Sequence, residues 1–250
     1  MTKTIAPLAA VLLAASAATP VFAQATQPAS TQPAATQPAA NDTGTSPSDA
    51  LKLAIAERHG LADWPAVTRL AFTFNVETAN RRVERVWTWA PHTNAVTLFE
   101  NSTTTAFTHG PDVPEADRAA DAKFINDTYW LLMPFYLVWA DCELSPPTIL
   151  DGDDKPDVLS DIDGPITMTT VTFPTGGYTP GDAYDLYLDE TNLLIGWTFR
   201  RGGKPGGNVM PFFDHVTQHG ITMALDHQRP GGGFRLWFTE VEVEAPPSAN

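Results

Sequence analysis

The sequence has little cysteine and little positive charge. Cys142 is the only cysteine among 250 residues, so no internal disulfide can form and stability must come from a hydrophobic core. We expect Cys142 to be a small buried hydrophobic residue rather than a nucleophile. Lysine and arginine number 15 against 29 aspartates and glutamates, which gives a formal net charge of −14. Because such an acidic surface repels phosphates, the composition argues against a nucleic-acid partner.

Motifs of nucleophilic catalysis and phosphate binding are also missing. The chain contains no G-x-S-x-G sequence and no H-E-x-x-H sequence, which are typical of serine hydrolases and zinc peptidases. The glycine-rich segments 202–203 and 231–233 lack the strand-to-helix context of a phosphate-binding loop. We therefore expect no catalytic residue that spacing alone identifies, and no cofactor.

Two segments contain possible metal ligands, but neither has the spacing of a metal site. His215 and His219 are four residues apart, yet Gly220 and strand-like neighbours argue against the helix that would bring them together. The acidic loop at 151–157 has Lys155 where a calcium loop places a ligand. We expect no metal site and a solvated acidic loop.

The first 46 residues have the features of a targeting segment and a linker. Residues 1–23 combine Lys3, an apolar run over 5–18 and the sequence Val21-Phe22-Ala23, which predicts a cleavable secretory signal peptide without a lipid-attachment cysteine. Residues 24–46 repeat Thr-Gln-Pro-Ala and lack aromatic and large aliphatic side chains, which predicts a disordered linker. We expect a periplasmic or secreted protein with one folded domain at 47–245 and no transmembrane segment in the mature chain.

An apolar segment at 124–140 is the most unusual part of the folded region. It contains no charged residue from Tyr129 to Ala140, but about a dozen residues are too few to cross a bilayer, which needs about 20. Since Pro134 lacks an N–H, we expect a short helix over 128–133, capped by Asp127 and followed by extended chain. The segment must be buried in protein or line an apolar cavity.

Strands dominate the rest of the chain. Apolar and polar residues alternate over 70–76 and 82–90, which predicts a half-buried antiparallel hairpin, and the pattern continues to residue 108 as a meander. A second hairpin is predicted over 184–199, around the turn at 189–192. Further strands are expected near 166–173 and over 209–243. Nine or ten strands without regular strand–helix alternation favour a curved, mainly β (α+β) fold over a parallel α/β fold.

The order of these elements resembles the LolA-like superfamily of periplasmic lipoprotein carriers, in a secreted branch. The resemblance is carried by Leu70-Ala-Phe-Thr-Phe74, Val86-Trp-Thr-Trp89, Phe124-Ile-Asn-Asp-Thr-Tyr-Trp-Leu-Leu-Met-Pro-Phe135, and Tyr184-Asp-Leu-Tyr-Leu-Asp-Glu-Thr-Asn-Leu-Leu-Ile-Gly-Trp197. It implies a curved, incompletely closed antiparallel β-barrel, or half-barrel, with helices covering the open side. It also implies an apolar cavity that holds acyl chains.

We therefore expect a periplasmic, non-enzymatic binding or carrier protein for an acyl chain, a lipid or another apolar ligand. The expected cavity lining is Trp87, Trp89, Trp130, Met133, Phe135 and Phe212. The same aromatic side chains would also suit a solid core. Two alternatives remain: a secreted hydrolase or isomerase with Asp127 or a histidine as base, and a ligand-free interaction module of the cell envelope, with another envelope protein as its partner.

Overall fold

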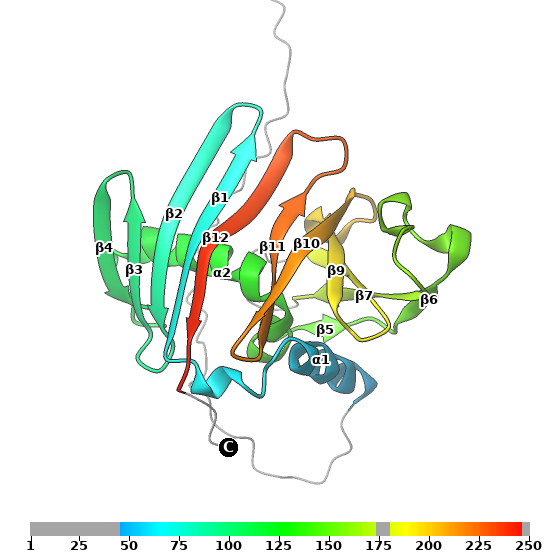
Figure 1. The fold of residues 1–250 in the computed structure, drawn as a ribbon, viewed down its shortest axis with the longest axis horizontal. Helices are drawn as coiled ribbons and strands as arrows, with labels where there is room; N and C mark the ends of the chain where they lie inside the picture. Colours follow the sequence, from blue (N-terminus) through cyan, green and yellow to red (C-terminus); the bar gives the residue numbers. More distant parts are fainter. Residues whose placement is uncertain (1–45, 174–180, 247–250) are drawn as a thin grey trace, which may run out of the picture.

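The computed structural model describes residues 46–173 and 181–246. Twelve strands form one antiparallel sheet in the order β4-β3-β2-β1-β12-β11-β10-β9-β8-β7-β5, with β6 also paired to β7. The sheet curves, and its two ends are not paired with each other in the described chain (Figure 1). The expected incompletely closed antiparallel half-barrel with covering helices is confirmed.

The strands are bounded as follows: β1 Arg69–Thr78, β2 Arg81–Ala90, β3 Ala95–Glu100, β4 Thr103–Thr108, β5 Glu143–Leu144, β6 Thr148–Leu150, β7 Ile166–Thr172, β8 Ala183–Leu188, β9 Leu194–Arg200, β10 Val209–Gln218, β11 Ile221–Gln228 and β12 Phe234–Glu244. The α-helices are α1 Pro47–Arg58 and α2 Arg118–Trp139. The described residues also form four single-turn 3₁₀ helices: η1 Trp64–Ala66, η2 Gly152–Asp154, η3 Asp157–Leu159 and η4 Arg201–Gly203.

The predicted signal peptide at 1–23 and almost all of the predicted linker at 24–46 lie outside the described residues. Within the described part of the chain, no helix combines the length and the apolarity that crossing a bilayer requires.

Helix α1 begins after a capping serine and ends before a glycine, as the sequence predicts. Ser46 is the N-cap: its hydroxyl accepts a hydrogen bond from the backbone N–H of Asp49, and Pro47 occupies the first turn. Gly60 follows the helix with φ +97°, a left-handed conformation that favours glycine. A methyl group at Gly60 would lie 2.2 Å from the carbonyl oxygen of Gly220. This close approach fixes the end of α1 against the β10–β11 turn.

The two predicted hairpins are present and have local causes. In β1–β2, Phe72 pairs with Trp87 in a continuous antiparallel register, and alternate side chains point to opposite faces of the sheet. In β8–β9, the Asp189 carboxylate accepts hydrogen bonds from the backbone N–H groups of Thr191 and Leu193. Such self-bonding by aspartate stabilises a turn without help from distant residues.

Helix α2 differs from the prediction for the apolar segment. It runs through Pro134 to Trp139, and only Leu132 departs from helical geometry, with φ −121° and ψ 23°. Proline removes one backbone hydrogen bond and collides with the preceding turn, which the distortion at Leu132 relieves as a kink. Asp127 is not an N-cap, because it lies inside the helix, nine residues after the first helical residue, Arg118. The kinked helix persists because most of its residues from Phe124 onward are buried.

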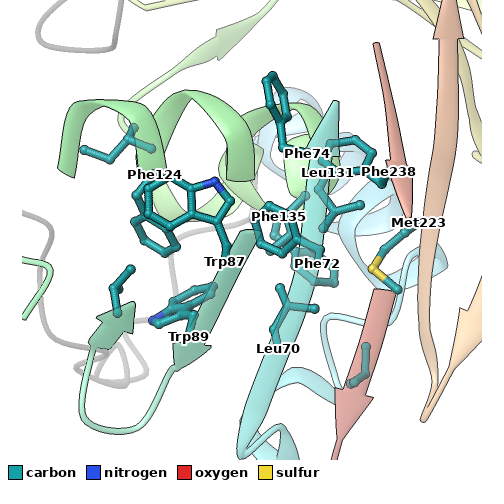
Figure 2. Packing of buried hydrophobic residues seen from close by; sticks show 14 of the residues in the cluster. Leu70, Phe72, Phe74, Trp87, Trp89, Phe124, Leu131, Phe135, Met223 and Phe238 are labelled. Carbon is teal, nitrogen blue, oxygen red and sulfur yellow. The ribbon is translucent and has the colours of Figure 1, made fainter. Parts of the chain in front are cut away.

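Helix α2 crosses the inner face of the sheet, the face that carries Phe72, Phe74 and Trp87 (Figures 1 and 2). Buried apolar side chains form one large cluster under β1, β2 and β12 and a second under β8, β9 and β10. Trp130 and Tyr136 of α2 touch both clusters. The helix therefore joins the two halves of the curved sheet into one core.

Candidate ligand-binding site

The six residues expected to line a cavity all lie in the layer between α2 and the inner face of the sheet. Two come from β2, three from α2 and one from β10: Trp87, Trp89, Trp130, Met133, Phe135 and Phe212. All except the half-buried Trp130 are less than 10% exposed. The structure thus brings together residues separated by more than a hundred positions in the chain.

Aromatic rings pack closely against each other in this layer. Phe124 of α2 lies between Trp87 and Trp89, at centroid distances of 5.5 and 5.3 Å (Figure 2). Further along the helix, the Trp130 ring lies 4.5 Å from that of Trp197. Tilted and edge-to-face pairs at these distances are favourable beyond the area they bury.

A small cavity remains where α2 meets β10 and β11. Its volume is about 10 Å³, and its lining includes Trp130, Met133 and Phe212 from the expected set together with His59 and His215. This volume accommodates about one water molecule. Any larger ligand between α2 and the sheet therefore requires these side chains to move.

His227 on β11 lies in the same layer and is fully buried. Its ring packs against Phe212, Trp130 and Phe238, at centroid distances of 4.2, 5.5 and 6.0 Å. Neither ring nitrogen makes a hydrogen bond of ordinary geometry within the described chain. The Ala224 backbone nevertheless lies close enough to raise the pKa of the ring slightly, against the larger effect of burial. Burial lowers the pKa of His227 from 6.5 to about 3, so the imidazole is neutral at pH 7.

A second side chain in this layer has a polar atom without a hydrogen-bond partner among residues 46–173 and 181–246. This atom is the indole nitrogen of Trp89 on β2. Buried donors and acceptors are normally satisfied, so each exception indicates strain or a missing partner. Both exceptions lie on the inner face, where α2 covers the sheet.

A buried ion pair holds the first half of α2 on β2. The Arg85 guanidinium donates two hydrogen bonds of 2.7 Å to the Asp127 carboxylate, and the Trp87 indole donates a third at 2.8 Å. Burial raises the pKa of Asp127, against the opposing effect of these donors. Because Arg85, Trp87 and Asn126 occupy its oxygens, Asp127 anchors the helix and is not placed to act as a general base.

The two histidines at the small cavity are held by backbone groups. His59 Nδ1 lies 2.8 Å from the Ile55 carbonyl oxygen, and His215 Nε2 lies 3.0 Å from that of Leu194. Burial lowers the pKa of His59 from 6.5 to about 4. In the described residues, no group of three or more histidine, cysteine, aspartate or glutamate side chains is placed to hold a metal ion.

Sequence reasoning overlooked His227 and Arg85, although a weak signal for both exists. His227 continues the alternation that begins at Ile221 and Met223, so period two places it on the buried face. Arg85 is likewise in phase with Trp87 and Trp89 on β2. A polar residue in phase with the apolar face of a strand indicates a buried contact, but it does not identify the partner.

Comparison with solved structures returns matches at low sequence identity and with TM-scores below 0.5. A DUF1329 family protein from Desulfovibrio piger has a TM-score of 0.43 and 11% identity, covering 80% of this chain and 94% of that one. The LolA superfamily protein NE2245 from Nitrosomonas europaea has a TM-score of 0.45 and 7% identity, covering 78% and 94%. No protein-family model matches the chain, and no curated protein matches its sequence.

Proposed function

We propose that the protein is a periplasmic, non-enzymatic binding or carrier protein for an acyl chain or another apolar ligand. The ligand lies between α2 and the inner face of the sheet. The six residues named above line its site, and α2 acts as the lid. Binding is driven by burial of apolar surface, worth roughly 25 cal/mol per Å² before the losses on association.

The observation that supports this proposal is the presence of unsatisfied polar atoms in an otherwise aromatic layer. The His227 ring and the Trp89 indole are buried and make no hydrogen bond of ordinary geometry within the described chain. An unsatisfied buried polar group is unfavourable by about 1–3 kcal/mol. A mainly apolar ligand with a single carbonyl or hydroxyl group would satisfy one of them while its body contacts the surrounding rings.

The attachment of α2 suggests which part of the helix moves. Its first half is held by the Arg85–Asp127 pair and by a 2.6 Å contact between His109 and Asp121. Beyond the distortion at Leu132, the second half is held mainly by apolar contacts. Apolar contacts are non-directional and are replaced readily by those of an apolar ligand. We therefore place the opening at the second half, with the kink as the hinge.

Native mass spectrometry tests the proposal directly. The chain is exported in a bacterium and purified from the periplasm without detergent, and its mass is measured before and after organic extraction. Added mass that extraction removes is expected. In the same spectra, a polypeptide mass that begins at Gln24 is the result expected if residues 1–23 are a cleaved signal peptide.

Substitutions locate the bound molecule. Trp130→Ala, in the proposed lining, should reduce the ligand-bound fraction, while Phe99→Ala, on an exposed side chain of β3, should leave it unchanged. An apo mass in every preparation, together with no saturable binding of added phospholipid or fatty acid, contradicts the carrier function and favours a ligand-free interaction module.

A further inference from the structure

A second site lies outside the layer beneath α2. An open groove of about 600 Å³ runs along the ends of β1, β10, β11 and β12, a volume within the range of small-molecule sites, about 300–1,000 Å³. The β1–β2 and β11–β12 turns lie side by side at this end of the sheet (Figure 1), since Thr78 pairs with Phe234. The turn at 229–233 contains three successive glycines, which leave one wall of the groove without side chains.

Strand register places most of the groove on the outer face, away from α2. Glu77 pairs with Arg235, and Phe213 pairs with Asp226. These residues are out of phase with the neighbours that face the helix, so their side chains point to the opposite side. Phe234, at the strand end, reaches both the groove and Trp130 of α2. Apart from this contact of Phe234 with Trp130, the groove lies on the opposite face of the sheet from the site proposed above.

Apolar side chains form one part of the groove. Phe213 is 45% exposed and Val158 of η3 is 40% exposed, and Pro211 and Phe234 extend the surface between them. Exposed phenylalanine and valine side chains that meet in one concave site indicate a binding surface, whereas single exposed ones do not.

The charged side chains of the groove are not equivalent. Arg235 donates to both oxygens of the Asp226 carboxylate, at 3.1 and 2.6 Å, and is thereby neutralised. The Arg229 guanidinium lies over the Phe234 ring, 6.0 Å from its centroid. Within residues 46–173 and 181–246, the Arg229 side chain has no acidic partner and no hydrogen bond. In a chain of net charge −14, an unpaired arginine beside an apolar surface is complementary to one anionic group.

We propose that this groove binds an amphiphile with a single carboxylate, its head on Arg229 and its apolar body on Phe213, Val158 and Phe234. A carboxylate accepts two parallel hydrogen bonds from a guanidinium. Glu77 lines the groove as well, and its charge opposes a doubly charged phosphate head more strongly than a singly charged carboxylate. The acidic surface likewise repels polyanions, which favours a small molecule over an acidic protein.

Isothermal titration with dodecanoate, below its micellar concentration and at low salt, tests the proposal on the full exported chain. A saturable site that depends on the groove residues is expected, in addition to any binding beneath α2. Arg229→Gln should weaken it about tenfold, as expected for loss of a charged hydrogen bond, and Phe213→Ser should weaken it several-fold. The matched controls are Arg118→Gln, an exposed arginine on α2, and Phe99→Ser, which is 48% exposed on β3. Both controls should bind as the parent does.

A photoreactive diazirine analogue of dodecanoate provides a second readout, since its label should be found on peptides that contain 211–213 or 228–235. Equal affinity in all four variants, or labelling confined to α2, overturns the groove site and leaves the inner site as the one that binds. Equal affinity for dodecyltrimethylammonium or for dodecyl phosphate overturns the assignment of the head group. Absence of saturable binding overturns the proposal altogether.

Discussion

Replacement of His227 by leucine should reduce the acid sensitivity of the fold. The folded protein keeps His227 neutral because burial lowers its pKa to about 3, whereas the unfolded chain binds a proton near pH 6.5. Between these two values the unfolded state holds a proton that the folded state lacks. Above pH 6.5, His227 therefore does not reduce the free energy of unfolding. As the pH falls from 6.5 towards 3, proton binding to the unfolded chain lowers that free energy progressively.

The size of the effect at pH 5 follows from the pKa difference. At 1.36 kcal/mol per pH unit, the 1.5 units between pH 6.5 and pH 5 amount to about 2 kcal/mol. The result depends little on the folded pKa, because any value near 3 or 4 leaves the imidazole almost fully neutral at pH 5. His59, with a pKa of about 4, lowers the free energy of unfolding by a similar amount. These two residues together should therefore lower the free energy of unfolding of wild type by about 4 kcal/mol at pH 5.

Urea unfolding followed by tryptophan fluorescence at pH 8 and pH 5 measures this difference. Between pH 8 and pH 5, the free energy of unfolding of His227→Leu should fall by about 2 kcal/mol less than that of wild type. This expectation holds whatever the stability of the variant at pH 8. The control His92→Gln, which removes an exposed histidine, should retain the wild-type difference. Equal losses in wild type and His227→Leu would show that folding does not lower the pKa of His227 and would refute this reasoning.

Three further substitutions or probes test other parts of the structure. Asp127→Asn removes the carboxylate that pairs with Arg85 at 2.7 Å and leaves the buried guanidinium with only the longer 3.8 Å contact to Glu100, so it should lower the free energy of unfolding by about 3 kcal/mol, measured in urea. Gly60→Ala places a methyl group 2.2 Å from the Gly220 carbonyl oxygen at a positive φ, and should lower the melting temperature by several degrees in calorimetry. Cys142, whose pKa burial raises to about 11, should react with a thiol reagent only after unfolding.

Matched controls separate these causes from general effects of substitution. Asp49→Asn breaks an exposed ion pair with Lys52 and should change stability by less than about 1 kcal/mol. Gly231→Ala has a positive φ but no atom within 4 Å of the added methyl group, so only backbone strain applies. If Asp127→Asn lowers the free energy of unfolding no more than Asp49→Asn does, the buried ion pair is not the cause of its effect. If Gly60→Ala lowers the melting temperature no more than Gly231→Ala does, the close contact with Gly220 is not the cause. Fast reaction of Cys142 in the folded protein would contradict its burial.

The strands and their turns were predictable because their causes are local. Alternation over β1 and β2 needs only neighbouring residues, and the Asp189 carboxylate that stabilises the β8–β9 turn acts within four positions. The N-cap at Ser46 has the same local character. The overall half-barrel also agrees with the family resemblance, although the register between β1 and β12 joins residues that are more than 150 positions apart in the chain.

The prediction for α2 was wrong because it applied a local rule to a buried segment. Proline disfavours a helix by about 3 kcal/mol, a penalty that assumes an exposed host. Here Met133, Phe135 and Leu137 bury their side chains beside Pro134, and burial of each large apolar side chain is worth about 1.5–3 kcal/mol. Two or three such residues outweigh the proline, so the helix continues and the strain is confined to Leu132.

The position of α2 nevertheless has a cause that can be read from two charged residues. Arg85 is in phase with Trp87 and Trp89, so the β2 pattern directs a guanidinium into the core, where an arginine requires an acidic partner. Asp127, at the edge of a segment that is otherwise uncharged for a dozen residues, is the acid that this segment offers. Their 2.7 Å contact places the helix across the inner face of β2. The buried guanidinium of β2 and the buried carboxylate of α2 thus require each other, and their contact helps to fix where the helix docks on the sheet.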